Sequence, residues 1–143
     1  MCAHLAELNG IDRDTIMMQV FDTGPELKEQ EYLKKRSLFL DTLFSYLFKL
    51  HKEDILAIED SVVLNFTVRG SGLIDSVWLV SPKNYPFKNI YNFIKDYDFK
   101  GPLVEFYTSK PELYQCTVAL VLLLNRETKM LYVRFYFTEI KKE

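Results

Sequence analysis

The chain has 143 residues, of which 48% are hydrophobic and 27% are charged, and its formal net charge is −2. This length suits one domain, so we interpret residues 1–143 as a single domain with one core. The composition excludes an intrinsically disordered chain and a small fold held together by disulfides. Positive and negative residues are interspersed, which leaves no basic stripe for a phosphate backbone, and we therefore expect no nucleic-acid partner.

The two cysteines, Cys2 and Cys116, bear on the compartment. A disulfide between them would tie the beginning of the chain to the interior of a predicted strand, so we expect two free thiols and a cytoplasmic protein. No signal-peptide pattern opens the sequence, and its longest apolar runs are far shorter than the roughly 20 residues of a membrane-spanning helix. The sequence therefore predicts no membrane span.

The first part of the chain, residues 1–22, has the weakest pattern and is interpreted as an N-terminal arm on the main body. Residues 3–8 fit a short helical turn, and residues 16–21 fit either a strand or a helix. A long helix is then predicted over residues 24–50. Its start is indicated by Thr23 and Glu26, which have the spacing of a capping box.

From Leu38 onward this helix is apolar nearly all round, which predicts that it lies across a sheet. A membrane helix is disfavoured because about 13 apolar residues are too few to span a bilayer. Phe39 and Tyr46 are expected to remain outside the face buried on the sheet. They are therefore candidates for contact with a second subunit, and a homodimer is one hypothesis.

The clearest pattern in the chain is a β-hairpin over residues 61–80. Apolar and polar residues alternate over 61–69 with the period of a half-buried strand, and an apolar strand returns over 73–80. The glycines of Gly70-Ser71-Gly72 suit the tight turn between them. A phosphate-binding loop would need a helix after these glycines, and here a strand follows.

The remaining elements are a second helix and three further strands. The helix is predicted over residues 87–97, and the strands over 103–107, 113–124 and 129–139. We therefore expect an α+β fold: an antiparallel, partly curved sheet of about five strands, with a long N-terminal helix and a shorter middle helix packed on one face.

The last predicted strand supplies the candidate site. Its alternation places Tyr132, Arg134 and Tyr136 on the outward side, and Tyr and Arg are the residues that most often anchor protein interfaces. The alternative is a ladder of side chains that only stabilises the sheet face. We predict a non-catalytic protein-binding module, such as an inhibitor, immunity or adaptor protein, whose partner is another protein.

No catalytic residues, metal ligands or cofactor are predicted. His51 ends the long helix beside acidic residues, but the other histidine, His4, lies far away in the sequence, and a metal site needs three or four converging donors. Cys116 falls in mid-strand on the side that carries Val118 and Leu120, as a small hydrophobic residue would. The alternative function is a small-molecule binder or an enzyme with a cavity between sheet and helices.

The segment SVVLNFTVRGSGLIDSVWLVSP, followed by a helix, resembles the C-terminal domain of TonB-type energy transducers, where a hairpin with a glycine turn precedes a helix and a closing strand. The resemblance covers less than half of the chain. The long apolar helix before the hairpin and the extra strands after it depart from that pattern. It implies a TonB C-terminal-like domain as a weaker alternative. The size, acidity and layout of the chain are also similar to those of small bacterial immunity proteins.

Overall fold

The structure is a computed structural model. It describes the backbone of residues 3–6 and 17–21, and both backbone and side chains of residues 30–143. The described residues form an antiparallel sheet with helices beside it, so the predicted α+β class is confirmed. The predicted helix start at Thr23 and Glu26 lies outside the described residues, as does Cys2.

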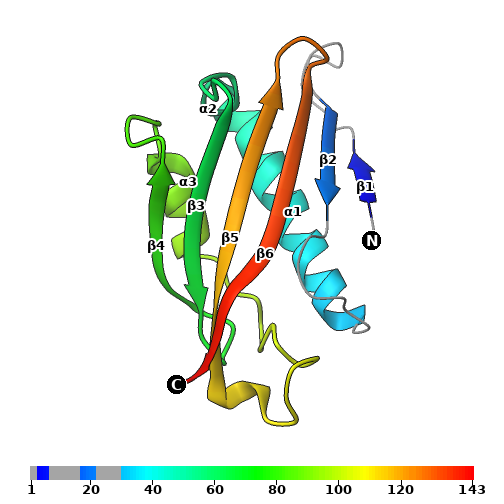
Figure 1. Ribbon diagram of the computed structural model, residues 1–143, viewed down its shortest axis with the longest axis vertical. Coiled ribbons are helices and arrows are strands. Elements are labelled where there is room, and N and C mark those ends of the chain that lie inside the picture. Colours follow the sequence, from blue (N-terminus) through cyan, green and yellow to red (C-terminus); the bar gives the residue numbers. More distant parts are fainter. Residues whose placement is uncertain (1–2, 7–16, 22–29) are drawn as a thin grey trace.

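Six strands form one sheet in the order β1-β2-β6-β5-β3-β4 (Figure 1). Neighbouring strands are antiparallel except for β2 and β6, which run parallel. The strands are β1 (Ala3–Ala6), β2 (Met17–Phe21), β3 (Ser61–Val68), β4 (Ile74–Ser81), β5 (Tyr114–Asn125) and β6 (Met130–Lys142).

The predicted count of five strands is wrong in two places. The helical turn predicted over residues 3–8 is replaced by β1 in its described part, because those residues pair with β2 along the edge of the sheet. The strand predicted over 103–107 does not form. There the amide of Tyr107 donates to the carbonyl of Val104 at 3.0 Å, so the chain turns, and Leu103 and Val104 contribute to the core from a loop.

Among the residues that the structure describes, four helical segments accompany the sheet. They are α1 (Gln30–Leu50), α2 (Lys52–Leu56), α3 (Lys88–Lys95) and the 3-10 helix η1 (Pro111–Leu113). Both α1 and α3 lie behind the strands in Figure 1, on one face of the sheet. Part of the apolar surface in the second half of α1 is not buried, because Leu38 is 63% exposed and Leu50 is exposed as well. No helix among the described residues is both long enough and apolar enough to cross a membrane.

The core between α1 and the sheet is rich in aromatic rings. The ring of Phe39 lies 5.5 Å from that of Phe66 on β3 and 6.0 Å from that of Phe135 on β6. Phe99, from the loop after α3, completes this cluster at 5.2 Å from Phe39. Because aromatic rings in such edge and tilted contacts fill space efficiently, this packing fixes the helix on the sheet.

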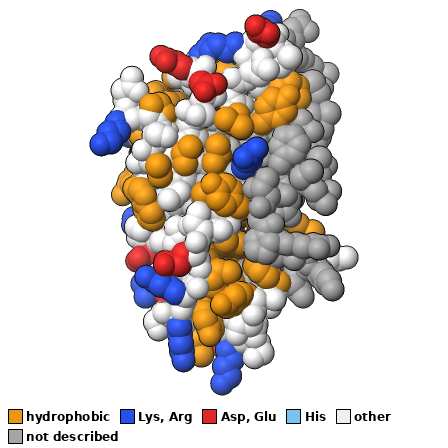
Figure 2. Space-filling model, viewed as in Figure 1, with side chains coloured by type: hydrophobic (Ala, Val, Ile, Leu, Met, Phe, Trp, Pro, Cys, Tyr) orange, Lys and Arg blue, Asp and Glu red, His pale blue; other side chains and the backbone are white. Residues whose placement is uncertain are grey.

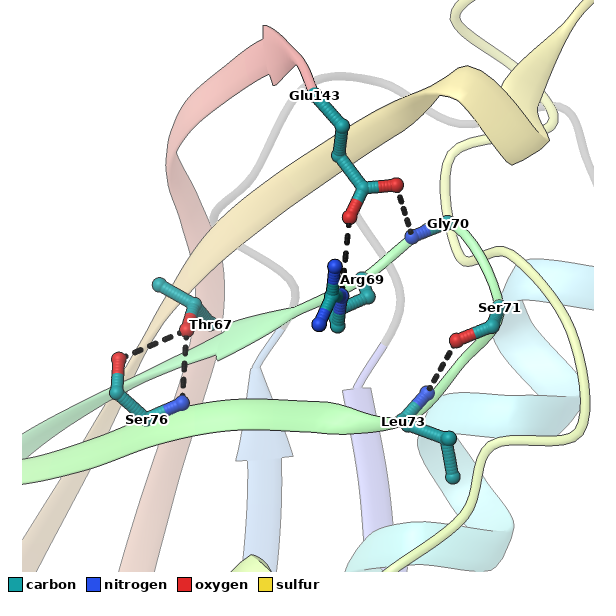
Figure 3. A network of polar contacts seen from close by, with 7 residues as sticks. All are labelled: Thr67, Arg69, Gly70, Ser71, Leu73, Ser76 and Glu143. Carbon is teal, nitrogen blue, oxygen red and sulfur yellow. Dashed lines mark hydrogen bonds and ion pairs between the residues drawn. The ribbon is translucent and has the colours of Figure 1, made fainter.

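A polar network fastens the β3–β4 turn to the last strand (Figure 3). The side chain of Glu143 accepts a hydrogen bond from the Gly70 amide at 3.3 Å and pairs with Arg69 at 3.2 Å. At Gly72 the backbone has φ +94°, a conformation that favours glycine. The predicted role of these glycines, reversing the chain between two strands, is confirmed.

Candidate functional site: the open face of the sheet

Strands β3 to β6 have one face under the helices and a second face turned away from them. We call this second face the open face. It consists of outward side chains from all four strands: Val63, Asn65, Trp78, Val80, Val121, Leu123, Tyr132, Arg134 and Tyr136. Figure 2 views the molecule from this side and shows hydrophobic side chains gathered over the strands, with charged side chains gathered at the two ends.

The strand register arranges the open face in rows. One row runs across four strands, from Trp78 through Asn65 and Ala119 to Tyr136. In the next row Val121 is paired with Arg134, and beyond it Leu123 is paired with Tyr132. Directly opposed side chains in an antiparallel pair lie about 5 Å apart, so members of each row contact one another across the strands. The rows form one continuous surface.

Two of the apolar residues on this surface are well exposed. Trp78 is 39% exposed and Val80 is 43% exposed, both on the outer strand β4. Sequence reasoning did not single them out, although Ser76, Trp78 and Val80 alternate with the more buried Val77 and Leu79. That alternation was the available signal, and it was obscured because both sides of the strand are apolar.

The predicted site residues do not all come together. Tyr132, Arg134 and Tyr136 lie on the outward side of β6, as the alternation predicts; the two tyrosines are half-buried and Arg134 is exposed. Tyr46 lies on the helical side, where its half-buried ring stacks on Phe93 at 5.3 Å. Phe39 is completely buried in the core, so the expectation that it stays available to a second subunit is corrected.

A hollow of about 540 Å³ adjoins the end of the open face. Leu123 and Tyr132 belong both to the open face and to the wall of the hollow. The rest of the wall comes from the segment before β3 and from the β5–β6 turn, and it carries the carboxylates of Glu59, Asp60 and Glu127. Sequence reasoning missed this feature because three separate segments of the chain build it.

The hollow has an acidic balance, with three carboxylates against the single guanidinium of Arg126. One nitrogen of that guanidinium, Nη2, donates to the carbonyls of Leu56 at 2.7 Å and Ile58 at 2.6 Å, which fixes the side chain to the end of α2. The three carboxylates have no ion-pair partner within the described part of the chain. The end of the open face is therefore a place where a cationic group would be attracted.

Asn65 adds a polar feature under the centre of the open face. Its side-chain oxygen Oδ1 is buried, and among the residues that the structure describes it has no hydrogen-bond partner. A buried amide oxygen without a donor costs free energy. The side-chain oxygen of Asn65 is therefore a hydrogen-bond acceptor on this face that the described residues leave without a donor.

Groups for catalysis are scarce in the described residues. No cluster of three or more His, Cys, Asp or Glu side chains that would hold a metal ion is found in residues 30–143. Burial raises the pKa of the Cys116 thiol to about 12, which makes it a poor nucleophile at neutral pH. Burial and, to a lesser extent, the charge of Asp54 raise the pKa of Tyr85, so its hydroxyl stays protonated. Its proton is donated to the Asp54 carbonyl at 2.6 Å.

A second hollow, of about 390 Å³, lies beside the first, with Glu59 and Arg126 on the ridge that they share. Most of its lining residues are apolar, although polar groups contribute as much of its surface as apolar groups do. It opens between the end of α2 and the loop before α3. The lining residues are Leu56, Ala57, Glu59, Val62, Pro82, Asn84, Tyr85, Pro86 and Arg126. This mixture of apolar walls and a few polar groups is of the kind that accepts a small molecule.

The architecture of the described residues is thus an α+β sheet with one face under helices and one open face. Comparison with known proteins adds no relative to this description. No protein-family model matches the sequence, and neither the search of curated proteins nor the search of solved structures found a match.

Proposed function

We propose that this protein is a non-catalytic protein-binding module that acts through the open face of its sheet. The observation that carries the proposal is the exposure of Trp78 and Val80 on an aromatic surface that continues to Tyr132, Arg134 and Tyr136. A contiguous apolar surface of this kind marks an interaction site, and Trp, Tyr and Arg are the residues that most often dominate binding energy. An inhibitor, immunity or adaptor protein would bind in this way.

The test is an affinity purification from cells with three forms of the chain. One carries Trp78→Ala, a second carries Tyr132→Ala with Arg134→Ala, and the matched control carries Tyr91→Ala, which removes an exposed aromatic residue from α3. We expect a stoichiometric protein partner that is lost with both open-face variants and retained with the control. Equal retention by all folded forms would contradict the proposal.

A cytoplasmic location is part of this proposal. It is supported by the thiol of Cys116, which is free and buried in the core. A reducing compartment keeps thiols in this state.

A second candidate function is small-molecule binding in the hollow of about 390 Å³. It is supported by the polar groups of Glu59, Asn84 and Arg126, which stand among apolar lining residues. A screen of metabolites by thermal shift tests it, with Ala57→Trp, at an exposed position of the wall, as the variant that fills the hollow. A ligand that raises the Tm of the native chain but not of the folded variant would favour this function.

The TonB C-terminal-like alternative ranks below both. In its favour, the β3–β4 hairpin is followed by α3 and by β5, which returns antiparallel beside β3. Against it, β6 pairs along the whole length of β5, a strand that the pattern lacks. Capture of an outer-membrane receptor peptide by the purified chain would restore this alternative.

A further inference from the structure

The open face carries a positive charge on β6 and adjoins a hollow that carries negative charges. Arg134 lies in the middle part of the open face, where its side chain is exposed and has no ion pair with any described residue. Tyr132, two residues earlier on β6, lines the acidic hollow that holds Glu59 and Glu127. Two residues along a strand correspond to about 7 Å, so an unpaired cation and an acidic hollow lie close together on an apolar surface.

Resting on the function proposed above, we propose that the partner of the open face is a second copy of this chain. The two copies are related by a twofold axis, so that Arg134 of each enters the acidic hollow of the other. A twofold axis brings residue i of one copy onto residue j of its partner and residue j onto residue i. The open face carries a cation next to an acidic hollow and is therefore complementary to the same face of a second copy.

The charges argue for this occupant over an unrelated protein. An unrelated partner would need its own cation and acidic group in the matching order and spacing, whereas a second copy has both by construction. The twofold axis turns one open face by 180° relative to the other. Each Arg134 then lies over the three carboxylates of the other copy and away from the other copy's Arg134. At the centre of the contact these charges are partly removed from water, which strengthens their attraction. The same contact covers the apolar rows of each open face.

The size of the face sets the expected affinity. Four strands at about 4.8 Å spacing and eight residues at about 3.4 Å make a face of roughly 500 Å² per copy. This is at the low end of specific interfaces, which bury about 800 Å² per partner. We therefore expect a reversible dimer with a dissociation constant in the range of about 1–100 μM, weakened by salt.

The experiment is sedimentation velocity of the purified full chain over a range of concentrations that spans this affinity. One variant carries Arg134→Glu, and a second carries Glu59→Lys with Glu127→Lys. We expect the native chain to show a monomer–dimer equilibrium and each variant alone to dimerise at least tenfold more weakly. An equimolar mixture of the two variants should recover the dimer, because the carboxylate introduced at position 134 meets the lysines introduced in the hollow while the second contact keeps its native charges.

The matched control is Lys88→Glu, a charge reversal on α3 at an exposed position of the helical side. It should leave the dimer unchanged, and circular dichroism should show that all variants are folded. A native chain that stays monomeric at every concentration, a dimer that neither variant weakens, or a mixture that does not recover association overturns this inference. Its failure is distinct from failure of the proposed function, since the cell purification would still return a partner that depends on Trp78 and Tyr132.

Discussion

Cys116 is the residue whose chemistry the fold changes most. Its thiol faces the core near the start of β5, and burial raises its pKa from the ordinary value of 9.0 to about 12. Below pH 9 the folded and unfolded chains both hold the proton, so the stabilising effect is fully present. Above pH 9 only the unfolded chain releases it, and the free energy of unfolding should fall by about 1.4 kcal/mol per pH unit.

The measurement is urea unfolding of the native chain and of Cys116→Ala between pH 8 and pH 10.5. Subtracting the unfolding free energy of the variant from that of the native chain leaves the contribution of the cysteine. The contributions of tyrosines and lysines, which titrate in the same pH range, cancel. We expect the native chain to lose stability with rising pH faster than the variant does. Parallel pH profiles would show that the thiol is accessible to water in the folded state.

Asp54 is a buried carboxylate in the middle of the short helix α2, and its oxygen Oδ2 accepts a hydrogen bond from the side chain of Asn89 at 2.9 Å. Asn89→Ala removes that donor and leaves a buried charge with fewer partners. We expect a loss of about 1–3 kcal/mol in the free energy of unfolding, measured with urea. Asn92→Ala, one turn along α3 at an exposed position, is the control and should change stability by less than about 0.5 kcal/mol.

At the scale of elements, α1 depends on its buried aromatic residue rather than on its exposed ones. Phe39 has 0% exposure, while its neighbour Leu38 is 63% exposed. Phe39→Ala should cost about 3–5 kcal/mol of unfolding free energy because it leaves a cavity among the rings of Phe66, Phe99 and Phe135. Leu38→Ala, one residue away on the same helix, should cost almost nothing. Similar losses for both would mean that α1 is not fixed as described.

The contact between β6 and the β3–β4 turn is expected to act locally. Glu143→Gln weakens the pair with Arg69 and the bond from the Gly70 amide, both partly exposed to water, so we expect a cost of about 0.5–1 kcal/mol. Hydrogen exchange should quicken at the Gly70 amide. In the control, Glu139→Gln, the exposed pair of Glu139 with Lys141 is lost and the exchange at Gly70 is unchanged.

The elements that the sequence predicts well are those with a strong period. The hairpin, the described part of the long helix, α3, β5 and β6 have clear alternation or helical spacing, and their bounds agree with the structure to within a few residues. The segment 103–107 has the composition of a strand but turns at Val104, because the loop delivers its apolar residues directly to the core. Local pattern does not distinguish these two ways of burying a short apolar run.

The candidate site is predictable only in part for a related reason. Alternation along β6 is enough to place Tyr132, Arg134 and Tyr136 outward, because one strand decides it. Trp78 joins them only through the pairing of four strands, and the acidic hollow only through three segments that meet in space. The buried position of Phe39 depends on which side of α1 meets the sheet, and an apolar surface on all sides of the predicted helix left that undecided.

At the scale of the whole molecule, the N-terminal strands protect an edge of the sheet. β2 pairs with the first part of β6, from Met130 to Arg134, and β1 covers β2. Deletion of residues 1–22 should expose the unpaired backbone of β6, lower the Tm by about 5 °C or more and cause aggregation through the exposed edge. Differential scanning calorimetry and light scattering test this; an unchanged, monodisperse chain would show that the two strands contribute little.

The parallel pairing of β2 with β6 has a consequence for synthesis of the chain. The two partners are about 110 residues apart, so a ribosome must add about 110 residues after β2 before β2 meets the strand that holds it. Until then β5 also lacks its partner on one side. The nascent chain therefore has two strands, β2 and β5, with an unpaired edge that can pair with other chains. Premature termination before Met130 would therefore release a product prone to aggregation, because β6 is the strand that joins β2 to β5.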